Sequence, residues 1–321
     1  MMPSAKAKNP GSIALMFPGQ GSQFPGMAAD LVAESPRARA LLQRADDILG
    51  YPLSRIMVGD RAEDLNRTVH TQPAVFVHSM ALFEVLRGCV QLEPIMAAGH
   101  SLGEYSALCA AGVLSFEAAL DLIRVRAEEM DSAQPTGTCC MAALVGLPKE
   151  EVLRLIELHR GEKVLEAANF NAPDQVVISG HLEAVTRAVE AAKKVKRSRA
   201  VMLPVSSAFH TSLMHPAKAA LQARLENLTA GVPRFPVVAN VNARAYPTSD
   251  HEVKQLLTEQ MVHPVLWEDC IRTMRDNGAE TFVEVGPGKV LAGLLRRIDK
   301  DAVGVSISDL TGVRSFQEVW A

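Results

Sequence analysis

The sequence predicts an α/β protein in which a small ferredoxin-like subdomain is inserted into a large subdomain built on a parallel sheet. Three observations lead to this fold class. Short apolar runs alternate with helical patterns over residues 11–133, the order changes to βαββαβ over residues 134–205, and alternation resumes to about residue 310. Strands alternating with helices favour a parallel sheet covered on both faces. We therefore expect residues 11–133 and 206–310 to form the large subdomain and residues 134–205 the small one.

The first part of the chain supplies two strands of the expected parallel sheet. A strand over residues 12–17 ends at a Pro-Gly pair, and helical patterns follow to about residue 49 and from about residue 71 to 87. A second strand over residues 95–98 leads into a helix over residues 104–111, which Gly112 ends as a C-cap. Ser115 is a good N-cap for a further helix that reaches about residue 132.

The middle of the chain has the ferredoxin-like order of elements. A Gln-Pro-Thr-Gly breaker at residues 134–137 precedes it, and Pro204 lies near its end. The expected elements are strand 138–146, helix 149–159, strand 164–170, strand 175–179, helix 182–194 and strand 199–205. The large subdomain then resumes with helix 213–228, strand 236–241, helices around 251–261 and 266–277, and strand 281–285.

Composition narrows the class of protein. The 321 residues contain 48% hydrophobic residues, enough for a large core, and the net charge of −3 gives no indication of bulk nucleic-acid binding. Five cysteines without metal-ligand spacing favour reduced, buried thiols in a cytoplasmic protein. No apolar run approaches the roughly 18 residues of a membrane span. Residues 1–10 are polar and predict a disordered start; an organellar matrix remains the alternative location if a targeting segment has been trimmed.

The segment Gly-His-Ser-Leu-Gly at residues 99–103 has the Gly-x-Ser-x-Gly form of a nucleophile elbow, which is typical of α/β-hydrolase-like folds. The pattern alone is common, but here a predicted strand precedes it and a predicted helix follows it. Such a turn exposes the central Ser101, and the two glycines let the backbone pass close by. The hydroxyl then lies at a helix N-terminus, where backbone N–H groups can stabilise an oxyanion.

A serine nucleophile needs a base and two oxyanion donors. His210 lies in a loop of small residues between a predicted strand and helix, a usual place for catalytic groups, although a solvent-facing histidine fits the same pattern. The N–H of Leu102 is the standard first donor. The glycine-rich loop at residues 17–23 can offer the second, although an ordinary turn fits as well, and it lacks the lysine of a phosphate-binding loop.

Arg126 stands among apolar residues on the helix predicted to begin after Ser115. An arginine in such surroundings usually extends to solvent or is paired. If Arg126 instead points into the pocket, its planar guanidinium suits a carboxylate, which predicts an acidic substrate.

These pieces together resemble malonyl-CoA:acyl carrier protein transacylases, the acyltransferases that load malonyl groups for fatty acid synthesis. The matching segments occur in the family's order and spread over most of the chain. They are Phe-Pro-Gly-Gln-Gly-Ser-Gln at 17–23, Gly-His-Ser-Leu-Gly-Glu-Tyr at 99–105, Arg126, Asn-Phe-Asn-Ala-Pro at 169–173, Ala-Phe-His at 208–210, and Glu-Val-Gly-Pro-Gly at 284–288.

The resemblance implies a role for each matched residue. Ser101 would be the nucleophile, His210 the base and Arg126 the clamp on the malonyl carboxylate. The backbone N–H groups of Gln20 and Leu102 would form the oxyanion hole.

Further roles also follow only from the resemblance. The family orients its histidine with a backbone carbonyl in place of an aspartate, which by position comes from near Gln260. Asn169 would contact the substrate, and Phe209 is associated with a preference for malonyl over methylmalonyl groups.

The resemblance implies malonyl-CoA and an acidic acyl carrier protein as partners, with no cofactor, because phosphopantetheine is carried by the partner. An acidic carrier calls for a local basic surface, although solvated helix ends explain the same charges. The candidate docking residues are Lys193, Lys194, Lys196 and Arg197 in one run, and Arg296 and Arg297 in another.

Two other functions remain open from the sequence. In the same fold, the protein could be a discrete acyltransferase or an acyl-carrier hydrolase of a polyketide synthase; a buried Arg126 argues against general hydrolysis, because it would reject apolar acyl chains. In a different class, it could be a docking partner that kept the fold without activity. The presence of Ser101, His210 and Arg126 argues against that function, and labelling with a serine-reactive phosphonate would test it.

Overall fold

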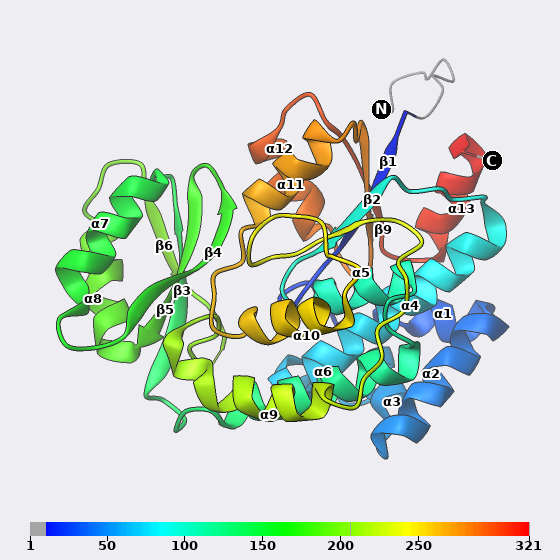
Figure 1. The fold of residues 1–321 in the computed structure, drawn as a ribbon, viewed down its shortest axis with the longest axis horizontal. Helices are drawn as coiled ribbons and strands as arrows, with labels where there is room; N and C mark the ends of the chain where they lie inside the picture. Colours follow the sequence, from blue (N-terminus) through cyan, green and yellow to red (C-terminus); the bar gives the residue numbers. More distant parts are fainter. Residues whose placement is uncertain (1–10, 206, 321) are drawn as a thin grey trace.

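Two sheets, one parallel and one antiparallel, organise the structure (Figure 1), a computed structural model that describes residues 11–205 and 207–320. The expected α/β fold class is thereby confirmed. The predicted disordered start, residues 1–10, lies outside the described residues. Among the described helices, none combines the length and the apolar character needed to cross a membrane.

The strands are β1 (Ile13–Phe17), β2 (Met96–Gly99), β3 (Cys139–Val145), β4 (Leu165–Ala172), β5 (Gln175–His181), β6 (Arg199–Met202), β7 (Val237–Val238), β8 (Thr281–Val285) and β9 (Val303–Ile307). The α-helices are α1 (Ala29–Glu34), α2 (Pro36–Leu49), α3 (Leu53–Val58), α4 (Thr68–Cys89), α5 (Gly103–Ala111), α6 (Phe116–Ser132), α7 (Lys149–Arg160), α8 (Leu182–Ala192), α9 (His215–Leu225), α10 (Asp250–Glu259), α11 (Trp267–Asp276), α12 (Val290–Ile298) and α13 (Leu310–Trp320). Two 3₁₀ helices are η1 (Ala62–Asn66) and η2 (Ser212–Met214).

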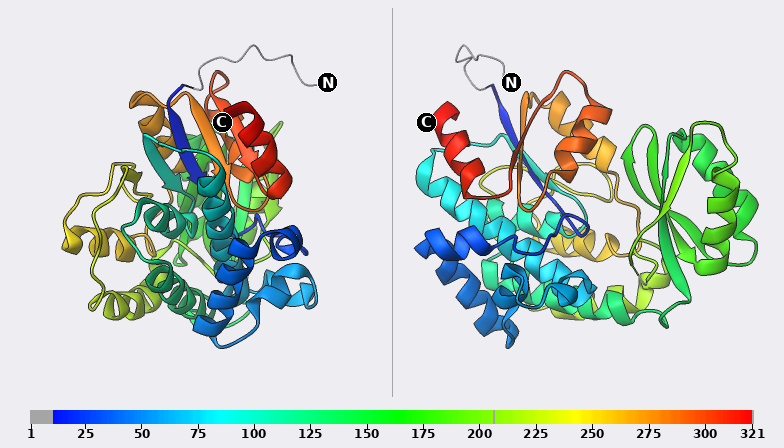
Figure 2. Two further views of the ribbon diagram at one scale, coloured as in Figure 1. Left: turned by 90° about the vertical axis from the view of Figure 1, so that its right-hand side faces the viewer. Right: turned by 180° about the vertical axis from the view of Figure 1, so that it is seen from behind.

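The larger sheet is parallel, with the strand order β7-β2-β1-β8-β9. Its central strand β1 alternates between two cores, because successive side chains of a strand point to opposite faces. Leu15 and Phe17 join the core that includes α4 and α5, whereas Ala14 and Met16 pack against α11 and α12. Helices therefore cover both faces of this sheet (Figure 2).

The smaller sheet is antiparallel, with the order β4-β5-β3-β6, and α7 and α8 cover one of its faces. The predicted βαββαβ sequence is present as β3-α7-β4-β5-α8-β6. Along β3, Ala142 and Leu144 belong to the core under α7 and α8, whereas Met141 and Ala143 belong to the main core. The second face of the small sheet is thus turned toward the large sheet and its helices.

Several elements differ from their sequence-based bounds. Two predicted strands are shorter than expected at their C-terminal ends. The strand predicted over 236–241 is only β7, because the chain turns back after it and the N–H of Ala239 donates to Arg244 at 2.8 Å. The strand predicted over 199–205 ends at Met202, two residues before Pro204, which has no backbone N–H to donate. The chain also continues past residue 310 as α13, which adds Phe316 to the main core.

Candidate active site

Ser101 lies in the tight turn between β2 and α5, with φ of 51°, a left-handed conformation that a non-glycine residue seldom adopts. The glycines on either side are required by close contacts. A Cβ at Gly103 would lie 2.0 Å from the carbonyl oxygen of Phe17, and one at Gly99 would lie 1.8 Å from the carbonyl carbon of Gly103. The Gly-x-Ser-x-Gly pattern is therefore a packing requirement of this turn.

Asn240 holds the turn from outside, and sequence reasoning did not find it. Its side-chain oxygen accepts the backbone N–H of Ser101 at 2.8 Å, and its amide nitrogen donates to the oxygen of Gly99 at 2.7 Å. Asn240 follows β7 and is fully buried. It lies 139 residues from Ser101 along the chain, so no local sequence pattern predicts the contact.

His210 is the base candidate that the structure places beside Ser101. Its Nε2 lies 2.7 Å from the serine Oγ, and its Nδ1 lies 2.8 Å from the backbone oxygen of Gln260. Because a carbonyl only accepts, Nδ1 carries the proton and Nε2 is free to accept the serine proton. Burial, followed by the nearby charge of Arg126, lowers the pKa of His210 to about 3, so the ring is neutral at physiological pH.

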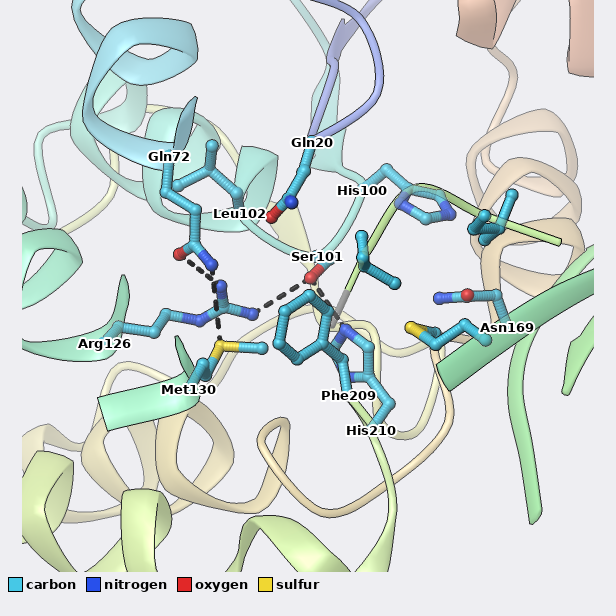
Figure 3. Close-up of a pocket in the computed structure, with 13 residues that line it drawn as sticks. Gln20, Gln72, His100, Ser101, Leu102, Arg126, Met130, Asn169, Phe209 and His210 are labelled. Carbon is cyan, nitrogen blue, oxygen red and sulfur yellow. Dashed lines mark hydrogen bonds between the residues drawn. The ribbon is translucent and has the colours of Figure 1, made fainter. Parts of the chain in front are cut away.

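Arg126 is only 1% exposed and reaches the same serine (Figure 3). Its Nη2 donates to Ser101 Oγ at 2.9 Å and to the side-chain oxygen of Gln260 at 3.0 Å, and its Nη1 donates to Gln72 at 2.6 Å. Its buried Nε has no hydrogen-bond partner within the described part of the chain. Burial lowers the pKa of Arg126 from its very high ordinary value. Gln72 had no sequence signal, because an isolated glutamine on a helix is unremarkable.

The loop after β1 lies directly against the serine turn. A Cβ at Gly19 would lie 2.4 Å from the oxygen of His100, so the backbone that leads to Gln20 passes close to the serine. Within the described residues, the backbone N–H groups of Gln20 and Leu102 donate to no other group. The side chain of Gln20 donates to Thr68 at 3.3 Å. Two free amides near a serine hydroxyl are suited to holding a developing negative charge.

These groups surround a cavity of about 90 Å³. Its polar part consists of Ser101, His210, Arg126 and Gln72, and its apolar wall consists of Met130, Met141, Leu203, Val205 and Phe209. Asn169 of β4 lines it from the small sheet (Figure 3). Within the ranges that the structure describes, no group of three or more His, Cys, Asp or Glu residues is placed to hold a metal ion.

The six basic candidates for docking lie away from this cavity, on two separate elements. Lys193, Lys194, Lys196 and Arg197 follow α8 and are exposed, and Lys193 pairs with Glu190 at 2.8 Å. Arg296 and Arg297 are exposed on α12. Arg297 pairs with Asp174, between β4 and β5, at 2.7 Å.

A serine at a strand–helix elbow, with a histidine and two free amides beside it, defines the class of serine-dependent acyl-transfer proteins. The chain belongs to the acyl transferase domain family, whose profile matches residues 15–314. The resemblance drawn from the motifs is confirmed, and the protein is an acyltransferase.

Individual relatives cover nearly the whole chain. The malonyl CoA-acyl carrier protein transacylase of Haemophilus influenzae is 41% identical over 306 residues, covering 95% of this chain and 98% of that protein. The structure of an acyl carrier protein S-malonyltransferase from Vibrio cholerae has a TM-score of 0.90 at 40% identity, covering 95% of this chain and 99% of that one. A malonyl-transacylase solved in complex with a type II PKS acyl-carrier protein has a TM-score of 0.92 at 38% identity, covering 96% and 99%.

Proposed function

We propose that this protein transfers the malonyl group of malonyl-CoA to the phosphopantetheine thiol of an acyl carrier protein, through a malonyl ester on Ser101, in fatty acid biosynthesis. One observation carries the choice of substrate: a buried guanidinium, Arg126, donates to the nucleophile itself at 2.9 Å. A buried cation without a carboxylate partner calls for an anionic ligand. Malonyl-CoA supplies a carboxylate two carbons from the thioester carbonyl.

The first step forms the malonyl ester. His210 Nε2 takes the hydroxyl proton of Ser101, and Oγ attacks the thioester carbonyl to form a carbon–oxygen bond. The N–H groups of Gln20 and Leu102 stabilise the negative oxygen of the tetrahedral intermediate. Breakage of the carbon–sulfur bond releases coenzyme A, whose sulfur receives the proton from His210.

The second step reverses these roles. His210 takes the proton of the carrier's thiol, and the thiolate attacks the ester carbonyl to form a new carbon–sulfur bond. The bond from carbon to Ser101 Oγ breaks, and the serine recovers its proton from His210. The backbone oxygen of Gln260 keeps the imidazole in the required tautomer throughout, because it accepts the Nδ1 proton at 2.8 Å.

Arg126 selects and orients the acyl group in this scheme. Its Nε–H and an Nη2–H form the side of the guanidinium that can bind a carboxylate through two parallel hydrogen bonds, and the Nε–H is unpartnered among the described residues. Phe209 and Asn169 line the remaining cavity and limit the substituents that the acyl chain can carry.

Mass spectrometry after incubation with malonyl-CoA tests the proposal. A malonyl adduct on the peptide that contains Ser101 is the expected result, and it should disappear when holo acyl carrier protein is added. An adduct on another residue, or none, would contradict the nucleophile assignment.

Service to a polyketide synthase or hydrolysis of mis-loaded carriers is the second candidate for the same site. A buried Arg126 disfavours hydrolysis of simple acyl groups, because they leave the cation without an anion. Measuring malonyl transfer and acetyl-carrier hydrolysis side by side distinguishes a transferase from a hydrolase. Faster hydrolysis than transfer would favour the alternative.

The carrier protein docks, in this proposal, through the basic residues after α8 and on α12. Reversing the charge of Lys194, Lys196 or Arg297 should slow malonyl transfer to the carrier and leave malonyl loading from coenzyme A near normal. The reason is that attraction between these basic residues and an acidic carrier mainly raises the rate at which the two proteins associate, and salt screens it. Arg55→Glu on α3, far from α8 (Figure 2), is a control with the same change in charge. Unchanged carrier kinetics in all three variants would exclude these residues from docking.

Three further assignments belong to this proposal. Both steps move an acyl group between nucleophiles of this chain and its substrates, so they require no cofactor. Five unpaired cysteines, of which only Cys89 is exposed, support a reducing compartment, either the cytoplasm or an organellar matrix. The small subdomain comprises residues 134–205 and the large one residues 11–133 and 206–310, with α13 attached; residue 206 itself lies outside the described residues.

A further inference from the structure

A buried carboxylate that neither chemical step uses lies directly behind the serine. Glu104, on the first turn of α5, is 0% exposed. Its Oε1 accepts from the hydroxyl of Tyr246 at 2.6 Å and from the backbone N–H of Asn240 at 3.1 Å, and its Oε2 accepts from the side-chain amide of Gln260. Burying a carboxylate is costly, so three donors converging from distant segments indicate a retained purpose.

Gln260 connects this carboxylate to both working parts of the site. Its backbone oxygen accepts from His210 at 2.8 Å, and its side-chain oxygen accepts from Arg126 at 3.0 Å. Its side-chain nitrogen donates to the backbone oxygen of Ser101 at 2.9 Å and to Glu104. The orientation of one amide group therefore decides what Arg126 and Ser101 contact.

The ionised carboxylate of Glu104 favours that orientation, together with Arg126, which can only donate, and the backbone oxygen of Ser101, which can only accept. An ionised carboxylate only accepts hydrogen bonds, so the NH₂ end of the Gln260 amide must face Glu104 and the oxygen end must face Arg126. A protonated carboxyl, or a glutamine in its place, brings a donor to the position now occupied by Oε2. The NH₂ of Gln260 then faces another donor at residue 104. If the Gln260 amide rotates by half a turn to avoid this, its NH₂ faces the guanidinium of Arg126 instead.

We propose that Glu104 is a positioning residue for malonyl loading: in its carboxylate form it fixes Gln260 so that Arg126 and His210 are held ready for the substrate. This inference rests on the proposed function. The carboxylate of Glu104 hydrogen-bonds to neither the hydroxyl of Ser101 nor the ring of His210, and it acts through Gln260.

The titration of Glu104 makes the proposal testable. Burial raises its pKa to about 7, against the opposing effects of its three hydrogen bonds and the charge of Arg126 on α6. The other titratable groups that face it are Tyr105 on α5, Tyr246 after β7 and Cys270 on α11, and each of these has a pKa raised by burial. They remain neutral near pH 7, so Arg126 is the charged group in this set.

His210 does not titrate in the same range, because its pKa is lowered to about 3. A rise in malonyl loading as the pH passes through about 7 therefore reports ionisation of Glu104 and not deprotonation of the base. This assignment reverses the usual attribution of such a limb to the histidine.

The test measures kcat/KM for loading Ser101 from malonyl-CoA and from acetyl-CoA, from well below pH 7 to well above it. Wild type is compared with Glu104→Gln and Tyr246→Phe. Glu284→Gln is the matched control, because Glu284 is also buried with a raised pKa but accepts from the start of α12 and from Ser306, away from the cavity.

The wild type should show an acid limb near pH 7. Glu104→Gln should show no acid limb. At pH values above that limb, its kcat/KM for malonyl loading should be about tenfold or more below the wild-type value, the effect of one misplaced hydrogen bond to a charged group. Its kcat/KM for acetyl loading should fall by a smaller factor. Tyr246→Phe removes a donor that favours the carboxylate, so its limb should move to higher pH. Glu284→Gln should keep the wild-type limb and the wild-type malonyl-to-acetyl ratio.

Two results would overturn the proposal: a Glu104→Gln enzyme that retains the wild-type limb and acyl ratio, or a limb that shifts in Glu284→Gln and not in Tyr246→Phe. Tyr246→Phe still tests the proposal if Glu104→Gln does not fold. Absence of a malonyl ester on Ser101 in the wild type would instead remove the proposed function, and this inference with it.

Discussion

Replacing Arg126 should change which acyl group the enzyme accepts. Arg126→Ala removes the guanidinium that is proposed to hold the malonyl carboxylate, and Arg126→Lys replaces it with a single ammonium group. A hydrogen bond to a charged group is worth about 1.5–3 kcal/mol, so malonyl kcat/KM should fall roughly 10- to 150-fold in the alanine variant. Lysine should restore part of this loss, because an ammonium cannot reproduce the planar pair of donors.

The structure also sets a background loss that must be separated from selectivity. Removing Arg126 leaves the side-chain oxygens of Gln72 and Gln260 without their buried donor, at about 1–3 kcal/mol of folding stability each. Acetyl transfer measured on the same protein corrects for this loss, because it depends on the same folded fraction. Per folded molecule, acetyl kcat/KM should hold or rise, since an uncharged acyl group no longer faces an unpaired cation.

The assay is therefore the malonyl-to-acetyl ratio of kcat/KM in the wild type and both variants. Arg124→Ala is the control on the same helix, where the guanidinium pairs with Asp121 and Glu128 and does not line the cavity. If both acyl groups lose activity by the same factor in Arg126→Ala, the residue supports the fold and does not recognise the substrate.

Three other outcomes follow from the site and its surroundings. Ser101→Ala should abolish the malonyl ester, and His210→Ala should slow its formation by about 10²- to 10⁴-fold in single-turnover measurements; persistence of the ester in Ser101→Ala would refute the nucleophile assignment. Between pH 4.5 and about 7, Glu104 is protonated in the folded state and ionised in the unfolded state. The free energy of unfolding of the wild type, measured by denaturant titration, should therefore fall by about 3 kcal/mol over this pH range relative to that of Glu104→Gln. If the two free energies change with pH in the same way, the raised pKa of Glu104 is contradicted. Gly103→Ala should strongly lower the melting temperature, because the new Cβ would lie 2.0 Å from a backbone oxygen. Gly293→Ala on α12 should raise the melting temperature slightly, because a Cβ there meets nothing within 4 Å and alanine favours a helix. Equal changes in melting temperature for the two variants would exclude the steric argument.

Local patterns predicted the elements that hold the proposed nucleophile and base. The apolar run before Gly99, the elbow and the loop of His210 are each contained in a few consecutive residues, so sequence reasoning could find them. Periodicity and breakers also predicted the order of strands and helices along residues 134–205, because both signals lie within short stretches of sequence.

Contacts between distant segments were beyond such reasoning. Glu104 and Gln260 are separated by 156 residues, and Asn240 reaches Ser101 across 139, so their pairing depends on how the sheet brings its strand ends together. The edge strand β9 was missed for a related reason. Its sequence includes Gly304 and Ser306, so it is not one of the continuous apolar runs that predicted the other strands, and it gains its stability from pairing with β8.

The proposed nucleophile and base both lie in the left-handed backbone region, Ser101 with φ of 51° and His210 with φ of 59°. Each such conformation costs on the order of 1–3 kcal/mol for a residue with a side chain, and glycine would relieve it. Random substitution followed by selection for thermal resistance alone would therefore favour glycine at these two positions, where it would remove the proposed nucleophile or base. The protein therefore gives up stability at the two residues proposed to carry its chemistry, and variants recovered by such selection should be assayed for turnover before any gain in melting temperature is accepted.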